Sequence, residues 1–436
     1  MRRPRVLVAA YYFPPVGGGG VTRTLHAVRG LAGAGLEPWV LTVDDAAWAR
    51  DASRQAEVPP QARVLRLPNP DWGRVAAWVA RRRGAAAPAA GAGAGRLRRL
   101  AVPDLHVGWS ALAAGVASIL TAVRAVDLVY STSPPYSAAA VGALARALGV
   151  PWLADFRDGW TCCPTRADLP PRRVALERRM EDAVLQRADR VLFASEAVRA
   201  RCAARVPGLA ARSETLLTGY EPGEFAEARR TPAPAPDTLR IVHAGSLLGA
   251  RREDTCARFL AALRTWLARE PEARVRVCFL GAEPAAAAAL ASAGLRDVLE
   301  VAPALARAAL PAALAGSHLC LALQPPGPRG GDPVPGKLFD AAGAGRPVLG
   351  LAGPGAFADL VARLRLGAVC DPGDAEGVVR ALSVAWRRVR RGESALPFDP
   401  GGARELSCAR FASRLAALCT GLAAREGLPC PSPSAS

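Results

Sequence analysis

Asp332-Pro-Val-Pro-Gly-Lys337-Leu-Phe-Asp340-Ala-Ala-Gly-Ala-Gly-Arg346-Pro-Val-Leu-Gly350 is the stretch that decides the fold of this 436-residue chain. A loop rich in Pro and Gly leads into a short apolar helix, which Gly343 and Gly345 end before a buried strand at 347–351. This order of loop, helix and strand is typical of a parallel sheet covered by helices. A loop that feeds a helix N-terminus beside a cation also predicts a phosphate site.

The cation in this stretch, Lys337, is the only lysine of the chain, whereas the other 55 of the 56 basic residues are arginine. A lysine that survives among so many arginines indicates a site for a compact ammonium on a flexible stem. The alternative is a codon-bias remnant on a surface helix.

Length and composition point to two or more domains. At 436 residues and 51% hydrophobic content, the chain can bury a large core, which excludes wholesale disorder. No uninterrupted apolar run reaches the roughly 18 residues of a membrane helix. The apolar run at 6–13 is short and leads into Pro-Pro-Val-Gly, which favours a first strand over a signal peptide, so we expect a cytoplasmic protein.

Net charge and cysteine content limit the kinds of molecule and metal that the chain is expected to bind. The formal charge is +18, but the basic residues are spread along the chain with few aromatics among them. Affinity for phosphates or an acidic membrane surface explains this charge more simply than nucleic-acid binding. The ten cysteines contain no CxxC pair and the four histidines no pair at ligand spacing, so we predict free thiols and no metal site.

Strand and helix signals alternate along the chain. In the first half they predict strands at 5–11, 37–43, 63–67, 127–131, 151–156 and 190–194, with helices at 21–34 and 137–148. In the second half they predict strands at 239–244 and 275–280, a helix at 254–268 and further alternation to residue 370. The fold class is therefore α/β, with two Rossmann-like domains whose parallel sheets face each other across a ligand cleft.

Changes in composition predict the domain bounds. The first domain covers 1–220 and contains a basic low-complexity insertion at 81–99, which is either a solvated segment or an attachment to an anionic membrane. Residues 221–237, rich in Pro, Ala and charge, read as a linker. The second domain covers 238–400, a C-terminal helix within 401–427 packs back on the first domain, and 428–436 form a disordered tail.

Two loops in the second half suit a phosphorylated ligand. Asp332 and Asp340 bracket the loop and first helical turn around Lys337, and a carboxylate can accept two hydrogen bonds from a ribose diol. The other loop follows the strand at 239–244 and is suited to a diphosphate; it contains Gly245, Ser246, Arg251 and Arg252.

Two loops in the first half also follow predicted strands. The first offers free backbone N–H groups at a helix start; it contains Gly17, Gly18, Gly19, Gly20, Thr22 and Arg23. The second contains Asp155, Arg157 and Asp158, charges that are costly at a strand end unless they are paired or used. The alternatives are a structural turn for the glycines, an ion-pair network for the second loop, and an ordinary ion pair for Lys337 and Asp340.

Together these segments resemble the bacterial GT-B glycosyltransferases of the family 4-like group over nearly the whole chain. The segments that carry the resemblance are Tyr-Phe-Pro-Pro-Val-Gly-Gly-Gly-Gly-Val-Thr-Arg at 12–23, Pro-Asp-Leu-His-Val-Gly-Trp at 103–109, Ser-Thr-Ser-Pro-Pro-Tyr at 131–136, Pro-Trp-Leu-Ala-Asp-Phe-Arg-Asp at 151–158, His-Ala-Gly-Ser-Leu at 243–247 and Pro-Gly-Lys-Leu-Phe-Asp-Ala-Ala-Gly-Ala-Gly-Arg-Pro-Val-Leu at 335–349. The resemblance implies an acceptor-side first domain, which contains the glycine loop, and a second domain that binds a nucleotide sugar.

The resemblance also implies roles for single residues. Asp332 and Asp340 stand where the family often has two glutamates, the second of which contacts the ribose. The basic pair on the donor diphosphate corresponds to Lys337 and one of Arg251 and Arg252. The loop at 131–136 lacks the histidine that many members have. The candidates for contacts near the sugar are therefore His106, Asp155 and Asp158.

The function implied is transfer of a sugar from a nucleoside-diphosphate sugar to a glycan or lipid-linked glycan, with retention at the anomeric carbon. No Asp-x-Asp occurs in the sequence, so we expect a metal-independent enzyme without a cofactor, in which cations stabilise the departing diphosphate. The alternatives are a nucleotide-sugar epimerase of the same fold and an inactive homologue that acts as an interaction subunit. The expected location is cytoplasmic, with peripheral attachment to the inner face of the membrane.

Overall fold

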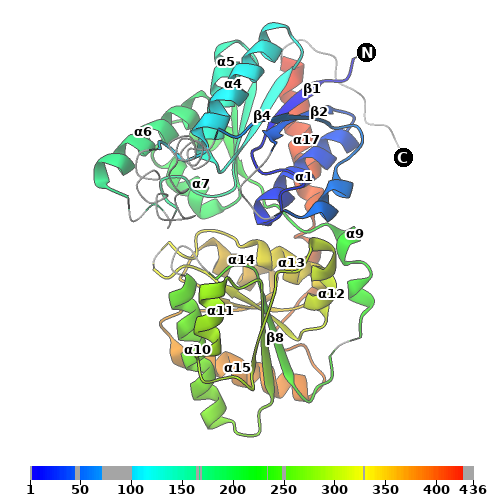
Figure 1. The fold of residues 1–436 in the computed structure, drawn as a ribbon, viewed down its shortest axis with the longest axis vertical. Helices are drawn as coiled ribbons and strands as arrows, with labels where there is room; N and C mark the ends of the chain where they lie inside the picture. Colours follow the sequence, from blue (N-terminus) through cyan, green and yellow to red (C-terminus); the bar gives the residue numbers. More distant parts are fainter. Residues whose placement is uncertain are drawn as a thin grey trace, which may run out of the picture. The chain divides into compact units, whose positions relative to one another are not determined.

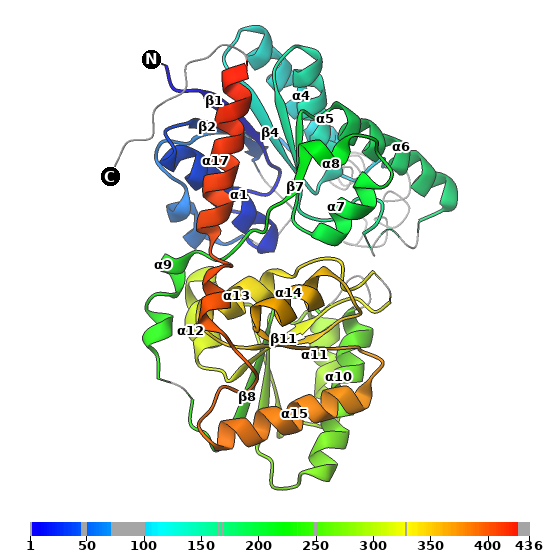
Figure 2. The same ribbon diagram turned by 180° about the vertical axis from the view of Figure 1, so that it is seen from behind.

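The computed structural model of the chain describes residues 2–44, 50–70, 101–163, 166, 169–232, 234–247, 252–327 and 329–425. It contains two units, which are described separately (Figure 1, Figure 2). The first unit comprises Met1–Ala194, Val198–Leu216 and Phe411–Ser436, and the second comprises Ser195–Ala197 and Leu217–Arg410. The predicted insertion at 81–99 and the predicted tail at 428–436 lie outside the described residues.

The first unit is built on a seven-stranded parallel sheet with the strand order β3-β2-β1-β4-β5-β6-β7. Its central strands β1, β4 and β5 are almost wholly buried, as expected for strands covered on both faces. The strands are β1 (Arg5–Ala9), β2 (Glu37–Val43), β3 (Arg63–Leu67), β4 (Leu128–Ser133), β5 (Trp152–Phe156), β6 (Arg190–Phe193) and β7 (Ser213–Thr215).

Helices follow the strands of this sheet and cover it. They are α1 (Gly19–Gly33), η1 (Ala52–Glu57), α4 (Val107–Ala122), η2 (Tyr136–Ala138), α5 (Ala139–Ala147), α6 (Pro171–Arg187), α7 (Glu196–Ala203) and α8 (Leu209–Arg212). The last helix of the chain, α17 (Cys408–Arg425), also packs into this core, where Phe411 and Leu415 are buried. A Cβ at Gly30 of α1 would lie 2.8 Å from the Cα of Ala412, so glycine permits α1 and α17 to approach closely.

The second unit contains a six-stranded parallel sheet with the order β10-β9-β8-β11-β12-β13. Its strands are β8 (Leu239–Ala244), β9 (Val275–Leu280), β10 (Leu299–Ala302), β11 (Leu319–Leu323), β12 (Val348–Leu351) and β13 (Gly367–Cys370). Its helices are α9 (Pro222–Phe225), η4 (Ala228–Arg230), α10 (Arg252–Arg269), α11 (Pro284–Ala291), η5 (Arg307–Ala309), α12 (Leu310–Ala315), α13 (Gly336–Ala344), α14 (Ala356–Leu364), α15 (Ala375–Arg390) and α16 (Pro400–Arg404). One hydrophobic core joins α10 and α15 to the sheet, and another joins α13 and α14 to it.

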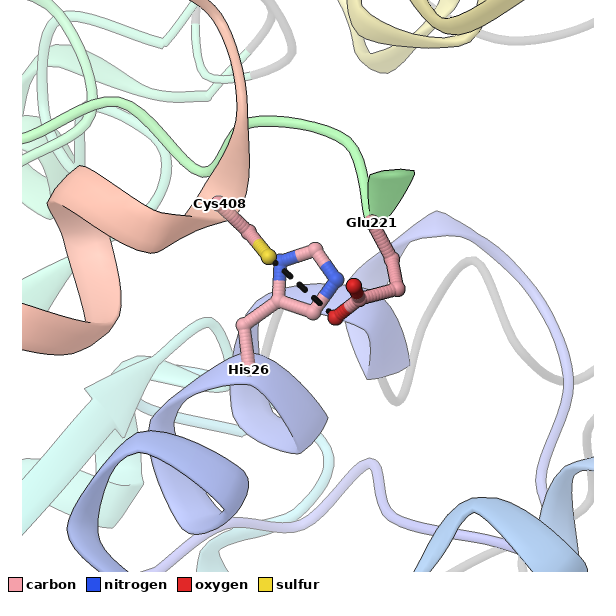
Figure 3. A group of neighbouring side chains, drawn as sticks. All are labelled: His26, Glu221 and Cys408. Carbon is pink, nitrogen blue, oxygen red and sulfur yellow. Dashed lines mark hydrogen bonds between the residues drawn. The ribbon is translucent and has the colours of Figure 1, made fainter. Parts of the chain in front are cut away.

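The predicted α/β architecture with two parallel sheets is confirmed. The segment 221–237 differs from its interpretation as a linker, because α9 and η4 lie within it and belong to the second unit. Phe225 is fully buried there, and its ring occupies the space that a Cβ at Gly343 would need. Just ahead of α9, Glu221 accepts a hydrogen bond of 3.3 Å from the thiol of Cys408 (Figure 3).

Candidate functional site

In the second unit, Lys337 lies in the first turn of α13, at the carboxyl edge of the sheet. Gly245 follows β8 at the same edge with a φ of +113°, a conformation that disfavours any side chain. A Cβ at Gly245 would lie only 3.1 Å from Nζ of Lys337. The glycine therefore lets the ammonium group lie directly against the backbone of the loop after β8.

Lys337 is buried beside other charged groups, and their effects on its pKa can be named. Burial lowers the pKa of Lys337 to about 8; the charge of Arg252 adds to this effect, and Asp340 and Glu283 oppose it. Arg252 is the first residue of α10, so two helix N-termini and two cations gather at one sheet edge. Such an arrangement favours an anion, and above all a diphosphate.

Only some of the residues that the sequence predicted for this site lie beside Lys337. Ser246 donates a hydrogen bond to Glu283, which also accepts from the backbone N–H of Leu247 at 3.1 Å. Asp332 is 4% exposed in the loop ahead of α13, whereas Asp340 lies on α13 beside the lysine. The other predicted arginine, Arg251, lies outside the described residues.

Asp340 has a further partner that the sequence did not indicate. Arg307 in η5 donates to Oδ1 of Asp340 at 2.7 Å and, through Nε, to Oε2 of Glu224 at 2.9 Å. Burial opposes the charge of Arg307, but the two carboxylates outweigh it and raise the pKa of Arg307. Arg307 therefore fixes the orientation of the Asp340 carboxylate, which remains partly exposed.

Three residues near this site were not predicted from the sequence: Glu283, Arg307 and Glu224. Glu283 follows β9 by three residues, and the rule that ligands gather at carboxyl ends of parallel strands would have indicated it. Arg307 and Glu224 had no such signal. His243, at the end of β8, is fully buried with Nδ1 3.0 Å from the carbonyl of Leu321, and burial lowers its pKa well below the usual range, so its ring is neutral.

At the carboxyl edge of the first unit, Arg157 joins three loops. Its guanidinium donates to the carbonyl of Gly20 in the first turn of α1, to the carbonyl of Pro134, and at 3.4 Å to that of Ser133. It also lies 5.7 Å from the centre of the Tyr12 ring. The predicted loops after β1, β4 and β5 are thus held together by one side chain.

Asp155 does not lie where a sugar could reach it. It is 1% exposed and accepts hydrogen bonds from Arg23 at 2.6 Å, Tyr130 at 2.7 Å and Thr132 at 2.9 Å. Burial works against its charge, but Arg23 and the hydroxyl donors outweigh it and lower the pKa of Asp155. The geometry supports the alternative reading, an internal ion pair, because a carboxylate saturated with donors has no capacity left for a ligand.

The remaining predicted residues of the first unit differ in their exposure. Gly18 and Gly19 are exposed at the start of α1, Gly17 is buried, and Thr22 accepts a hydrogen bond of 3.1 Å from Arg54. Asp158 is exposed just after β5. His106 precedes α4, half-buried, with its ring centre 4.2 Å from that of Tyr11 and 6.2 Å from that of Tyr12.

Comparison with known proteins bears on the fold of the chain and on its first half. A family model described as "Glycosyl transferase 4-like domain" matches residues 18–215. No curated protein matches the chain. Among solved structures, a glycosyltransferase from Rickettsia africae is similar with a TM-score of 0.66 and 12% identity, covering 97% of this chain and 99% of its own.

Two further structures show the same fold. Anabaena HepE in complex with UDP-glucose has a TM-score of 0.62 and 14% identity, covering 97% of this chain and 100% of its own. Sucrose-phosphate synthase from Thermosynechococcus elongatus has a TM-score of 0.60 and 17% identity, covering 98% of each chain. Residues 18–215 are thus similar to the glycosyl transferase 4-like domain, and the chain, with its two parallel sheets, has the GT-B fold of these structures.

Proposed function

We propose that this enzyme transfers a sugar from a nucleoside-diphosphate sugar to a glycan or lipid-linked glycan. The position of Lys337 is the observation that supports a nucleotide-sugar donor. Its ammonium group lies against Gly245 in the loop after β8 and close to Arg252 at the start of α10. The similar Anabaena protein was solved with UDP-glucose, which supports a nucleotide-sugar donor here.

In the proposed reaction the bond between the anomeric carbon and the diphosphate oxygen breaks, and the oxygen of the acceptor hydroxyl bonds to that carbon. Negative charge develops on the leaving oxygen, and the acceptor hydroxyl gives its proton to the departing diphosphate. Lys337 and Arg252, together with the N–H groups at the starts of α10 and α13, stabilise that charge. Asp340 accepts hydrogen bonds from the ribose hydroxyls. We propose that these groups act without a metal ion and that the anomeric configuration is retained, as the family resemblance implies.

The test is a panel of nucleotide sugars with release of nucleoside diphosphate as the readout. Lys337→Ala should lower the turnover number by two or more orders of magnitude, in line with loss of a transition-state contact worth about 3 kcal/mol. The matched control is Arg363→Ala, which removes an exposed cation from an ion pair with Glu405 at 3.4 Å. An unchanged rate for Lys337→Ala at saturating donor would refute the assignment.

The same assay tests independence from metal. Excess EDTA should leave the initial rate unchanged, because the cations of the protein meet the charge of the diphosphate. If EDTA abolishes activity and magnesium or manganese restores it, a metal ion takes part in the reaction. The ion, and not Lys337, would then stabilise the charge on the departing diphosphate.

A further inference from the structure

The amino edge of the first sheet carries an apolar surface that the transfer reaction does not use. At this edge α4, α5 and α6 end, and β4, β5 and β6 begin. Four large apolar side chains are exposed where α4 and α5 end; they are Ile119 (65%), Val123 (66%), Leu144 (42%) and Leu148 (50%).

The concentration of exposed apolar residues is unusual for this chain. Ten large hydrophobic side chains are exposed among the described residues, and five of them lie between Leu112 and Leu148. The 16 residues of α4 include no charged side chain, although the chain as a whole has 56 Lys and Arg. Leu112, Ile119 and Val123 are spaced by seven and four residues, so they share one face of the helix end.

Arginines border the same edge. Arg124 follows α4, Arg146 lies in the last turn of α5 and Arg187 ends α6. Arg146 is paired with Asp189 at 2.9 Å, whereas Arg187 bonds only weakly to a carbonyl of its own helix, Ala183, at 3.5 Å. A cation at a helix end offsets the helix dipole, but this effect gives no reason for exposed apolar side chains beside it.

A groove of about 670 Å³ connects the three helices. It is lined by Ala114 of α4, Ala140, Leu144 and Arg146 of α5, and Arg187 of α6, among others. Figure 1 shows α4 and α5 side by side in the first unit, with α6 next to them. Its lining combines small apolar side chains with two guanidinium groups, which suit the acyl chains and the phosphates of a bilayer surface.

We propose that the amino edge of the first unit attaches the enzyme to an anionic lipid bilayer. Ile119, Val123 and Leu148 enter the interface, and Arg124 and Arg187 contact lipid phosphates. The carboxyl edge of the same sheet, with Arg157 and the glycine loop, lies at the opposite ends of the strands. This attachment goes beyond the proposed transfer reaction and does not depend on the identity of donor or acceptor.

Vesicle co-sedimentation without any donor tests the proposal. The full chain should bind vesicles that contain phosphatidylglycerol, should not bind pure phosphatidylcholine vesicles, and should be released by high salt. The combined variant Ile119→Ser, Val123→Ser and Leu148→Ser should lower the partition coefficient about tenfold or more, because apolar area no longer leaves water. The variant Arg124→Gln with Arg187→Gln should lower the partition coefficient about 25-fold, since each basic residue near an anionic leaflet contributes a factor of about five.

The second unit offers matched controls. Val384 on α15 is 41% exposed, and Arg387 on the same helix bonds to the carbonyl of Ser383 as Arg187 does to that of Ala183. Val384→Ser and Arg387→Gln should leave vesicle binding unchanged. Because the substituted side chains are exposed, thermal unfolding and nucleoside diphosphate release should also match the unmodified protein in all variants.

Three results would overturn the proposal. Equal binding to neutral vesicles would remove the role of charge. Binding that survives both amino-edge variants but is lost when residues 81–99 are deleted would place the attachment in that insertion. A dimer in sedimentation equilibrium that the triple variant dissociates would identify the surface as a contact between two copies. A failure of sugar transfer in every assay would leave these results unaffected, and would count against the proposed function alone.

Discussion

Lys337 is the residue whose ionisation should control donor use. Its pKa, lowered to about 8 by burial, lies below the usual value, so the cation is present below that pH and is lost above it. We therefore predict that kcat/KM for the donor falls as the pH rises through about 8. Lys337→Arg keeps its charge at higher pH and should abolish this decline, although its larger planar group should lower the rate.

The pKa can be measured directly, since the chain has a single lysine side chain. Reductive methylation with ¹³C-formaldehyde gives one side-chain signal besides the N-terminal amine. A midpoint near the ordinary value of 10.5 would contradict the prediction. Because the unfolded chain binds this proton more tightly than the folded one, Lys337 should also make the free energy of unfolding rise with pH between about 8 and 10.5.

Arg307 should act on the donor through Asp340. If Asp340 contacts the ribose, the unmodified protein prefers the nucleoside diphosphate of its donor to the 2′-deoxy form, and Asp340→Asn loses this preference at a cost of about 1–3 kcal/mol. Arg307→Met should lose most of the same preference, because Asp340 is no longer oriented. The double variant should lose little more, since the two residues act as one unit.

A purely structural role for Arg307 would give a different result. It would lower stability and leave the preference for ribose over deoxyribose intact. Arg363→Ala, which breaks the exposed pair with Glu405, is the control for loss of an arginine and should change neither nucleotide affinity.

Single residues differ in how far the sequence could indicate them. Lys337 stood out as a candidate because the chain has no other lysine, and its role in donor binding stays a prediction. Arg307 and Glu224 are 83 residues apart and come from segments of unremarkable composition, so only the fold brings them together. Asp155 was a candidate because charge at a buried strand end is costly, but the same cost is met by Arg23, 132 residues away.

At the scale of elements, the loop after β8 depends on glycine at one position. Gly245→Ala should be destabilised by about 1–2 kcal/mol for its backbone conformation, and its methyl group should displace Lys337. Gly294→Ala is the matched control, since Gly294 also has a positive φ, +71°, but nothing lies within 4 Å of its Cβ position. Both variants should lower the melting temperature, whereas only Gly245→Ala should raise KM for the donor. An equal effect of both on KM would refute the argument.

Elements were predictable where apolar runs have clear ends. Strands expected at 37–43, 63–67, 239–244 and 275–280 coincide with β2, β3, β8 and β9, because turn-forming or charged residues bound each run. The strand expected at 5–11 ends at Ala9, since the chain turns before the two prolines. The segment 221–237 lacks any apolar run, so the packing of Phe225 into the second unit could not be seen in its composition.

The last helix of the chain, α17, contributes buried side chains to the core of the first unit. Phe411→Ala should lower the free energy of unfolding by about 3–5 kcal/mol, because its ring is buried in the first core and lies under the guanidinium of Arg23 at 4.5 Å. Hydrogen exchange should accelerate in β1 and β4 and stay unchanged in α10 and α15. The control is Ser413→Ala, on the exposed side of the same helix. Faster exchange in α10 instead would assign the helix to the second unit.

No helix in the described ranges combines the length and the apolar character that a membrane span requires.

The position of α17 also has a consequence for synthesis on the ribosome. The chain leaves the first unit at Leu216, continues through the second unit from Leu217 to Arg410, and returns at Phe411. At the usual rate of about 5–20 residues per second, roughly 10–40 seconds pass while the apolar face of α1 that receives α17 stands uncovered. Chaperones that hold nascent chains would have their main task in that interval, and a pause in translation before residue 408 would prolong it.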